Sequence, residues 1–180
     1  MKILGIDPGT ATTGYGVIKV KKRSNKLVCL DYGSIITSPT SNPCERLKKI
    51  EKEVNKLINR FHPQVLAVEK LYFFKNSKTI ISVSQAKGVI LLAAAKKKVP
   101  VVEFTPLEVK MATVGYGRAK KIQIQKMIQL LLDLKKLPKP DDAADALALA
   151  VCAHLMLFSK LSSQKQKTLD KGVGKNIMGL

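Results

Sequence analysis

Residues 2–20 read KILGIDPGTATTGYGVIKV, and this stretch decides the fold. The apolar run that ends at Asp7 predicts a buried strand, and Pro8-Gly9 predicts a turn directly after it. Residues 13–20 predict a second strand, with two glycines where side chains would crowd the turn. We therefore expect an acidic side chain at the end of the first buried strand, where the chain turns back on itself.

The elements that follow predict an α/β fold. Residues 27–37 predict a third strand, and the short connections make the three strands an antiparallel meander. Strands and helices then alternate, which predicts right-handed crossovers and two further, parallel strands. These later elements are strands at about 65–68 and 99–104, a helix after Pro43, a short helix after Pro106, and helices at about 77–97, 120–134 and 141–158.

Together these elements predict a five-stranded mixed sheet with helices on both faces. One domain is expected to cover residues 1–158. Residues 159–180 carry five Lys and one Asp, and we expect them to form a basic, disordered tail.

The charge of the chain favours a polyanionic partner. Lys and Arg number 32 against 13 Asp and Glu, a formal net charge of +19 in 180 residues. Such an excess favours nucleic acid, because neutralised phosphates release their counterions. A general preference for Lys is the alternative interpretation, since only four of the 32 residues are Arg.

A membrane partner is not expected, because the longest apolar run, Ala146 to Phe158, is too short to cross a bilayer. The three cysteines are widely spaced and lack a C-x-x-C pattern. Cys29 lies in a strand-like run and Cys152 among Ala and Leu, so we expect buried free thiols and a reducing, cytoplasmic location.

Carboxylates are scarce, and their placement predicts chemistry. Asp7 and Glu69 each end a strand, and strand ends in an α/β sheet meet at a crevice. The run Asp141-Asp142-Ala-Ala-Asp145 places further carboxylates on one face of a helix. Such close charges repel unless a cation lies between them, and oxygen ligands without His or Cys select Mg²⁺ or Mn²⁺. This pattern predicts metal-dependent phosphodiester cleavage.

Individually, these carboxylates also have structural interpretations. Asp7 could form an Asx turn ahead of Pro8-Gly9, and Asp141 could cap its helix. Helical spacing allows either Asp141 or Asp142 to act with Asp145. The residues alone leave these alternatives open.

Five stretches match a known family in order, from residue 1 to about 157: Leu4-Gly-Ile-Asp-Pro-Gly-Thr10, Thr13-Gly-Tyr-Gly-Val17, Ala67-Val-Glu69, Ser84-Gln-Ala-Lys-Gly88 and Asp142-Ala-Ala-Asp-Ala-Leu-Ala148. They resemble the RuvC family of bacterial crossover junction endodeoxyribonucleases. The resemblance implies a ribonuclease-H-like fold, a homodimer, and Mg²⁺-dependent paired nicking of opposed strands of a Holliday junction, the four-way DNA of recombination and repair. It also implies the partner proteins RuvA and RuvB.

The resemblance assigns roles by position. The catalytic and metal-binding residues implied are Asp7, Glu69, Asp142 and Asp145, around two Mg²⁺ ions for which Mn²⁺ can substitute. Only Asp142, and not Asp141, aligns with the D-A-A-D motif of the family.

DNA contacts are implied at several further positions. Tyr72 falls where the family places a base-stacking aromatic, with Phe73 and Phe74 as alternatives. Lys110 and Lys121 align with basic residues near the scissile phosphate. Arg118 belongs to a glycine-rich loop that we interpret as contacting phosphate. The helix of residues 84–95 aligns with the family's dimer interface, although packing onto the sheet would explain its small residues equally well.

Three other functions were compatible with parts of the sequence. Residues 7–14 resemble the phosphate loop of actin-like ATPases, but 180 residues leave no room for their second domain. A related ribonuclease-H-like nuclease acting on RNA, and a catalytically silent junction-binding protein, are the remaining alternatives. The intact set of four acids argues against a silent protein.

Overall fold

The computed structural model describes residues 1–21, 24–71 and 80–173, and their side chains up to residue 157. The five strands form one sheet in the order β3-β2-β1-β4-β5. The strands are β1 (Lys2–Asp7), β2 (Thr12–Val20), β3 (Leu27–Ile36), β4 (Val65–Glu69) and β5 (Val101–Phe104). The first three pair antiparallel, whereas β4 runs parallel to both β1 and β5. The predicted mixed sheet is confirmed.

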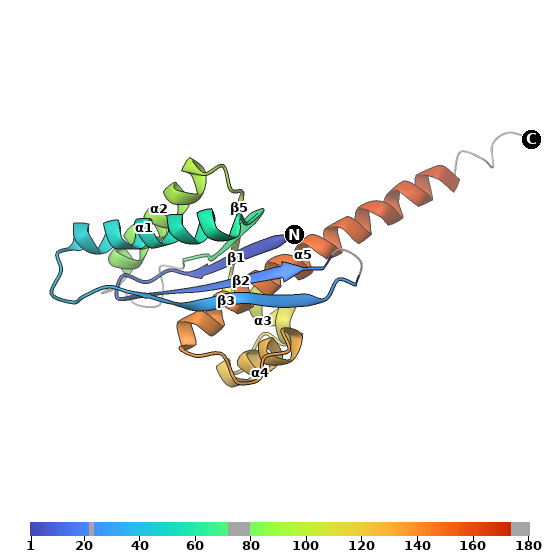
Figure 1. Ribbon diagram of the computed structural model, residues 1–180. Helices are drawn as coiled ribbons and strands as arrows, with labels where there is room; N and C mark the ends of the chain where they lie inside the picture. Colours follow the sequence, from blue (N-terminus) through green and yellow to red (C-terminus); the bar gives the residue numbers. More distant parts are fainter. Residues whose placement is uncertain (22–23, 72–79, 174–180) are drawn as a thin grey trace, which may run out of the picture.

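Five helices cover the two faces of this sheet (Figure 1). One face packs against α1 (Pro43–Phe61) and α2 (Ile80–Lys96). The opposite face packs against α3 (Pro106–Val114), α4 (Lys121–Leu131) and α5 (Asp141–Val173). The alternation along β1 explains the division, since Leu4 and Ile6 belong to the first core and Ile3 to the second. Asp7 therefore points to the face that α5 covers.

The C-terminal helix is longer than the sequence indicated. α5 begins at Asp141, as expected, but continues to Val173 instead of ending near residue 158, and it projects beyond the sheet (Figure 1). Residues 159–171 contain neither Gly nor Pro, so nothing in this segment forces the helix to end. The division into a domain and a basic tail stays a prediction. Among the helices described, none is long and apolar enough to cross a membrane.

Candidate active site

Two of the predicted acids lie side by side at the carboxyl ends of two neighbouring strands in the middle of the sheet. β1 and β4 are parallel neighbours, and Ile6 is in register with Val68, so the next residues, Asp7 and Glu69, emerge together. The two carboxyl groups share a hydrogen bond. Within the described chain, no bond from the Asp7 side chain to the following turn occurs, so the Asx-turn alternative is not observed.

The other two acids arrive on α5, which rests directly on the strands. Gly14 pairs with Asp7 across the β1–β2 ladder. A Cβ atom at Gly14 would lie 2.0 Å from the backbone oxygen of Asp142, and one at Gly5 would lie 2.0 Å from that of Ala146. The first turns of α5 therefore approach so closely that only glycine fits beneath them. Gly14 thus lets the acid-bearing helix α5 pack directly on the sheet, whereas the sequence suggested only relief of crowding at a turn.

All four acids act on one another electrostatically. Burial is the largest cause that raises the pKa of Asp7 to about 8, and the charges of Glu69, Asp145 and Asp142 contribute to the same rise. Burial and the charge of Asp145 likewise raise the pKa of Glu69. The structure thus brings together the four acids that the sequence identified, and burial together with their mutual repulsion favours a protonated Asp7.

Lys121, at the start of α4, is the counterion of this cluster. Its Nζ lies 2.7 Å from Asp145 Oδ2 and 3.5 Å from Asp141 Oδ2. Burial lowers the pKa of Lys121, but the hydrogen bond and charge of Asp145 outweigh burial and raise it overall. The pKa of Asp145 is nevertheless raised, because burial outweighs the effect of Lys121.

A cavity of about 220 Å³ opens beside the acids. Glu69, Asp145, Lys110 and Lys121 line it together with apolar side chains of α3, α4 and α5. Both lysines expected near the scissile phosphate therefore lie at the acids. Arg118 is exposed in the loop between α3 and α4, and within the described part of the chain no hydrogen bond or ion pair joins it to the acids. The aromatic residues Tyr72, Phe73 and Phe74 lie outside the described residues.

Asp141 differs from the four clustered acids. It is the first residue of α5, and the preceding Pro140 supplies the carbonyl that accepts the N–H groups of Ala143 and Ala144. The interpretation of Asp141 as the helix cap is therefore wrong. Its side chain is 63% exposed and accepts a hydrogen bond from Gln125 Nε2 at 3.1 Å. Asp141 thus contacts α4 at the rim of the cluster.

Lys87 is a charged residue near the acids that our sequence analysis did not single out. It is only 8% exposed, and its Nζ lies 2.6 Å from Glu103 Oε2 on β5. Its charge also counteracts the rise in the pKa of Glu69. Lys87 lies at helical spacing from the buried Ile90 and Ala94, but its charge favoured an exposed position, so the sequence alone did not predict its burial.

The four acids should make the metal-free protein less stable as pH rises. Asp7 keeps its proton up to a pKa of about 8 when folded, whereas its ordinary value is 3.8. Between these values the folded state binds more protons than the unfolded state, so the free energy of unfolding falls as pH increases. In EDTA, the Tm should decline from about pH 5 to pH 8. Thermal scans of wild type and Asp7→Asn test this, and an equal decline in both proteins would contradict it.

Asp141 and Asp142 should differ sharply on substitution. We expect Asp142→Ala to reduce cleavage by about 10³-fold, the scale of several kcal/mol of transition-state stabilisation. Asp141→Ala should keep cleavage within about threefold, since it removes only exposed contacts. Single-turnover cleavage rates of both variants measure the difference. Equal losses would place Asp141 among the catalytic groups.

Comparison with known proteins identifies the family. A family model, crossover junction endodeoxyribonuclease RuvC, matches residues 3–154. The RuvC protein of Fusobacterium nucleatum is 47% identical over 171 residues, which cover 95% of this chain and 89% of that protein. This chain belongs to the RuvC family. It is thus a crossover junction endodeoxyribonuclease, a resolvase of the Holliday junctions of recombination and repair.

Solved RuvC structures agree with this fold. Thermus thermophilus RuvC has a TM-score of 0.81 and 35% identity, and the match covers 88% of this chain and 97% of that one. The same protein in complex with a Holliday junction substrate has a TM-score of 0.80 and 37% identity, over 84% of this chain and 92% of that one. These matches confirm the ribonuclease-H-like, mixed five-stranded α/β fold that the resemblance implied for this chain.

Proposed function

We propose that this RuvC protein cleaves the junction with Mg²⁺ held by Asp7, Glu69, Asp142 and Asp145. The observation that carries the proposal is that Asp7 is buried and lies close enough to feel the charges of Glu69, Asp145 and Asp142, which together raise its pKa to about 8. A divalent cation would offset that repulsion. When bound, a pair of such ions supplies an activated water and stabilises the leaving 3′-oxygen.

The residues present fit this metal chemically. The donors are carboxylate oxygens from three elements of the fold, and hard oxygen ligands favour Mg²⁺ or Mn²⁺ over zinc. In the described residues, no three acidic, His or Cys side chains already converge as a metal shell. Asp145 instead contacts Lys121 at 2.7 Å, and Asp7 shares a hydrogen bond with Glu69. These contacts offset the charge that a cation would neutralise.

Basic side chains around the acids are suited to orient the DNA strand. Lys110 and Lys121 line the cavity beside Glu69 and Asp145, where they would attract the scissile phosphate. Arg118 is exposed and lies three residues before Lys121, and it would contact the DNA backbone further along the same DNA strand. We assign base stacking to Tyr72 by resemblance, with Phe73 and Phe74 as alternatives.

A homodimer would place two such sites on one junction and so produce paired, symmetric nicks. The exposed face of α2 supports this arrangement, because Ile81 is 70% exposed and Leu92 is 51% exposed on it. Gly88, between them on the same helix, has open space where its Cβ would be. RuvA and RuvB are proposed partners, and the cytoplasm is the proposed location, both from the family resemblance.

Incubation with three substrates tests the proposed function. A mobile four-way junction, a linear duplex and an RNA–DNA hybrid are each treated with Mg²⁺ or EDTA. We expect paired, symmetric, ligatable nicks in the junction alone, and only with Mg²⁺. Cleavage of the hybrid alone would favour the RNA nuclease, and junction binding without cleavage would favour the silent protein. Equal cleavage in Mg²⁺ and EDTA would exclude the metal.

A further inference from the structure

The loop that follows Asp7 has its carbonyl groups tied inward. The hydroxyl of Thr13 donates to the carbonyl oxygen of Gly9 at 2.6 Å, and that of Thr37 donates to the carbonyl oxygen of Thr10 at 2.5 Å. The backbone N–H of Thr37 donates to the carbonyl oxygen of Ala11 at 3.0 Å. Thr13 is fully buried and Thr37 is 4% exposed, so three successive carbonyls are held by groups inside the protein.

This arrangement turns backbone N–H groups outward. In a trans peptide the N–H points away from the carbonyl of the preceding residue. Because the carbonyls of Gly9 and Thr10 point inward, the N–H groups of Thr10 and Ala11 point outward. Within the described residues, neither N–H group has an acceptor. Successive unpaired N–H groups in a tight loop form a concavity that attracts anions.

An arginine is fixed beside the same loop. Arg46, near the start of α1, donates from Nε to Thr37 Oγ1 at 2.8 Å, so the hydroxyl that holds the loop also holds the guanidinium. Its Nη groups have no hydrogen bond or ion pair within the part of the chain described by the structure. Arg46 is one of only four arginines in the chain. A half-buried guanidinium with a fixed Nε leaves both of its Nη groups available to a phosphate.

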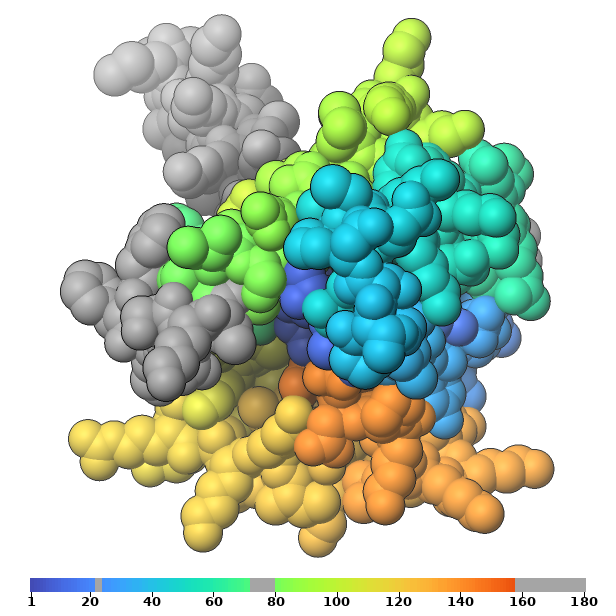
Figure 2. All heavy atoms as spheres, turned by 90° about the vertical axis from the view of Figure 1, so that its left-hand side faces the viewer, coloured from blue at the N-terminus to red at the C-terminus, as the bar shows by residue number. Residues whose placement is uncertain are grey.

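We propose that the N–H groups of Thr10 and Ala11 and the guanidinium of Arg46 bind one backbone phosphate of the DNA strand that enters the active site. We call these groups the loop phosphate site. The inference rests on the proposed function, because it assumes that the strand reaches Asp7. Figure 2 shows the start of α1 (cyan) beside the end of β1 (blue) and the start of α5 (orange) on one face. The loop phosphate site thus lies at the same end of the sheet as the four acids.

Its location gives the loop phosphate site a positioning role. Asp7 is followed within three residues by Thr10, so a phosphate bound to this loop fixes the strand relative to the catalytic carboxylate. The scissile phosphate itself requires the acids, and the loop phosphate site would therefore hold a neighbouring phosphate on the same strand. Base identity does not matter to such a contact, so it adds affinity and register but no sequence preference.

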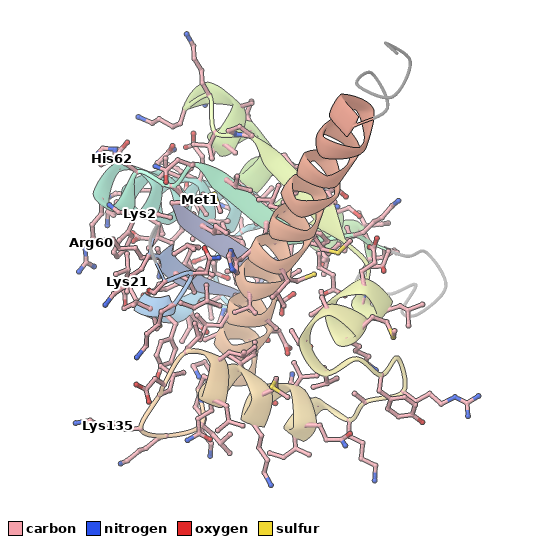
Figure 3. The ribbon with its side chains drawn as sticks, turned by 90° about the vertical axis from the view of Figure 1, so that its right-hand side faces the viewer. Met1, Lys2, Lys21, Arg60, His62 and Lys135 are labelled. Atoms are coloured by element: carbon pink, nitrogen blue, oxygen red, sulfur yellow. The ribbon has the colours of Figure 1, made fainter. Side chains whose placement is uncertain are left out.

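Salt dependence of binding provides the first test. Junction affinity is measured in EDTA, so that binding is observed without cleavage. The proteins compared are wild type, Arg46→Met, Arg46→Lys and a control, Arg60→Met. Arg60 lies on the same helix but at its far end, visible in Figure 3, and pairs with Asp31 at 3.2 Å. We expect Arg46→Met to weaken binding about tenfold and to reduce the slope of log K against log salt by about 0.9, the value for one lost phosphate contact. Arg46→Lys should keep the slope, and Arg60→Met should change neither quantity.

A chemical double-mutant cycle locates the phosphate. Single phosphates flanking the cut are replaced with uncharged methylphosphonate, and each junction is bound to wild type and to the Arg46 variants. At one position the replacement should weaken binding to wild type about tenfold but to Arg46→Met less than twofold. Additive effects at every position, or an unchanged slope in a folded Arg46→Met protein, would overturn the inference. If Arg46→Met does not fold, Arg46→Gln, which also lacks the charge, runs the same cycle.

The two proposals fail in distinguishable ways. If wild type does not prefer the junction to duplex, or cuts without Mg²⁺, the proposed function fails. If wild type binds and cuts the junction as expected but shows no coupling between Arg46 and any phosphate, only the loop phosphate site fails.

Discussion

Asp7→Asn is expected to lose at least about 10³-fold in junction cleavage, which corresponds to about 4 kcal/mol of transition-state stabilisation. Asp7 is the most strongly perturbed of the four acids, and it takes part in the repulsion with each of the other three. Asn keeps the size of the side chain but removes the charge that a metal ion needs. The loss should appear in the single-turnover rate at saturating protein.

Binding and stability should respond in the opposite direction. Removing a negative charge that faces phosphate should leave junction affinity unchanged or increased. The same change removes a buried, repelled carboxylate, so the Tm in EDTA should rise by about 3 °C or more at pH 9, where Asp7 of wild type is ionised. The control is Asp133→Asn, because the side chain of Asp133 is 83% exposed and pairs only loosely with Lys26, at 3.6 Å. Loss of binding in Asp7→Asn would show that Asp7 is structural.

Gly14→Ala is expected to damage the active site without touching a catalytic group. The new Cβ would lie 2.0 Å from the backbone oxygen of Asp142, so the first turn of α5 must move away from β2. A displacement of about 1 Å in a catalytic group can cost about 10²-fold in rate, and forcing atoms into a packed contact costs about 1–3 kcal/mol of stability. We expect both losses, measured as cleavage rate and Tm.

Gly33→Ala is the matched control. Gly33 lies on β3, and a Cβ there would meet only the side chain of Tyr15, which can adjust. Cleavage should stay within about threefold of wild type, since no catalytic element is displaced. If Gly33→Ala is as inactive as Gly14→Ala, the loss reflects general damage to the sheet and not the seat of α5.

Much of the fold followed from local patterns in the sequence. Apolar runs interrupted by Pro8-Gly9 located the first strands, and helical periodicity located α1. The same patterns failed for the end of α5, where no residue breaks the helix, and for Lys87, whose charge concealed a buried position. Helix ends and buried charges depend on contacts that periodicity does not contain.

For the four carboxylates of the site, too, the sequence predicted some features and left others to the tertiary structure. The sequence by itself determined that Asp7 and Glu69 each end a strand, because strand ends are visible in the apolar pattern. That these two strands are parallel neighbours was decided by the tertiary structure. It could not separate Asp141 from Asp142, since both lie at helical spacing from Asp145, and only the family resemblance favoured Asp142. The tertiary structure placed Asp142 against Gly14 and turned Asp141 toward Gln125. The physical reason is close packing, because the orientation of α5 is set by glycines on strands distant in sequence, and no local pattern encodes that contact.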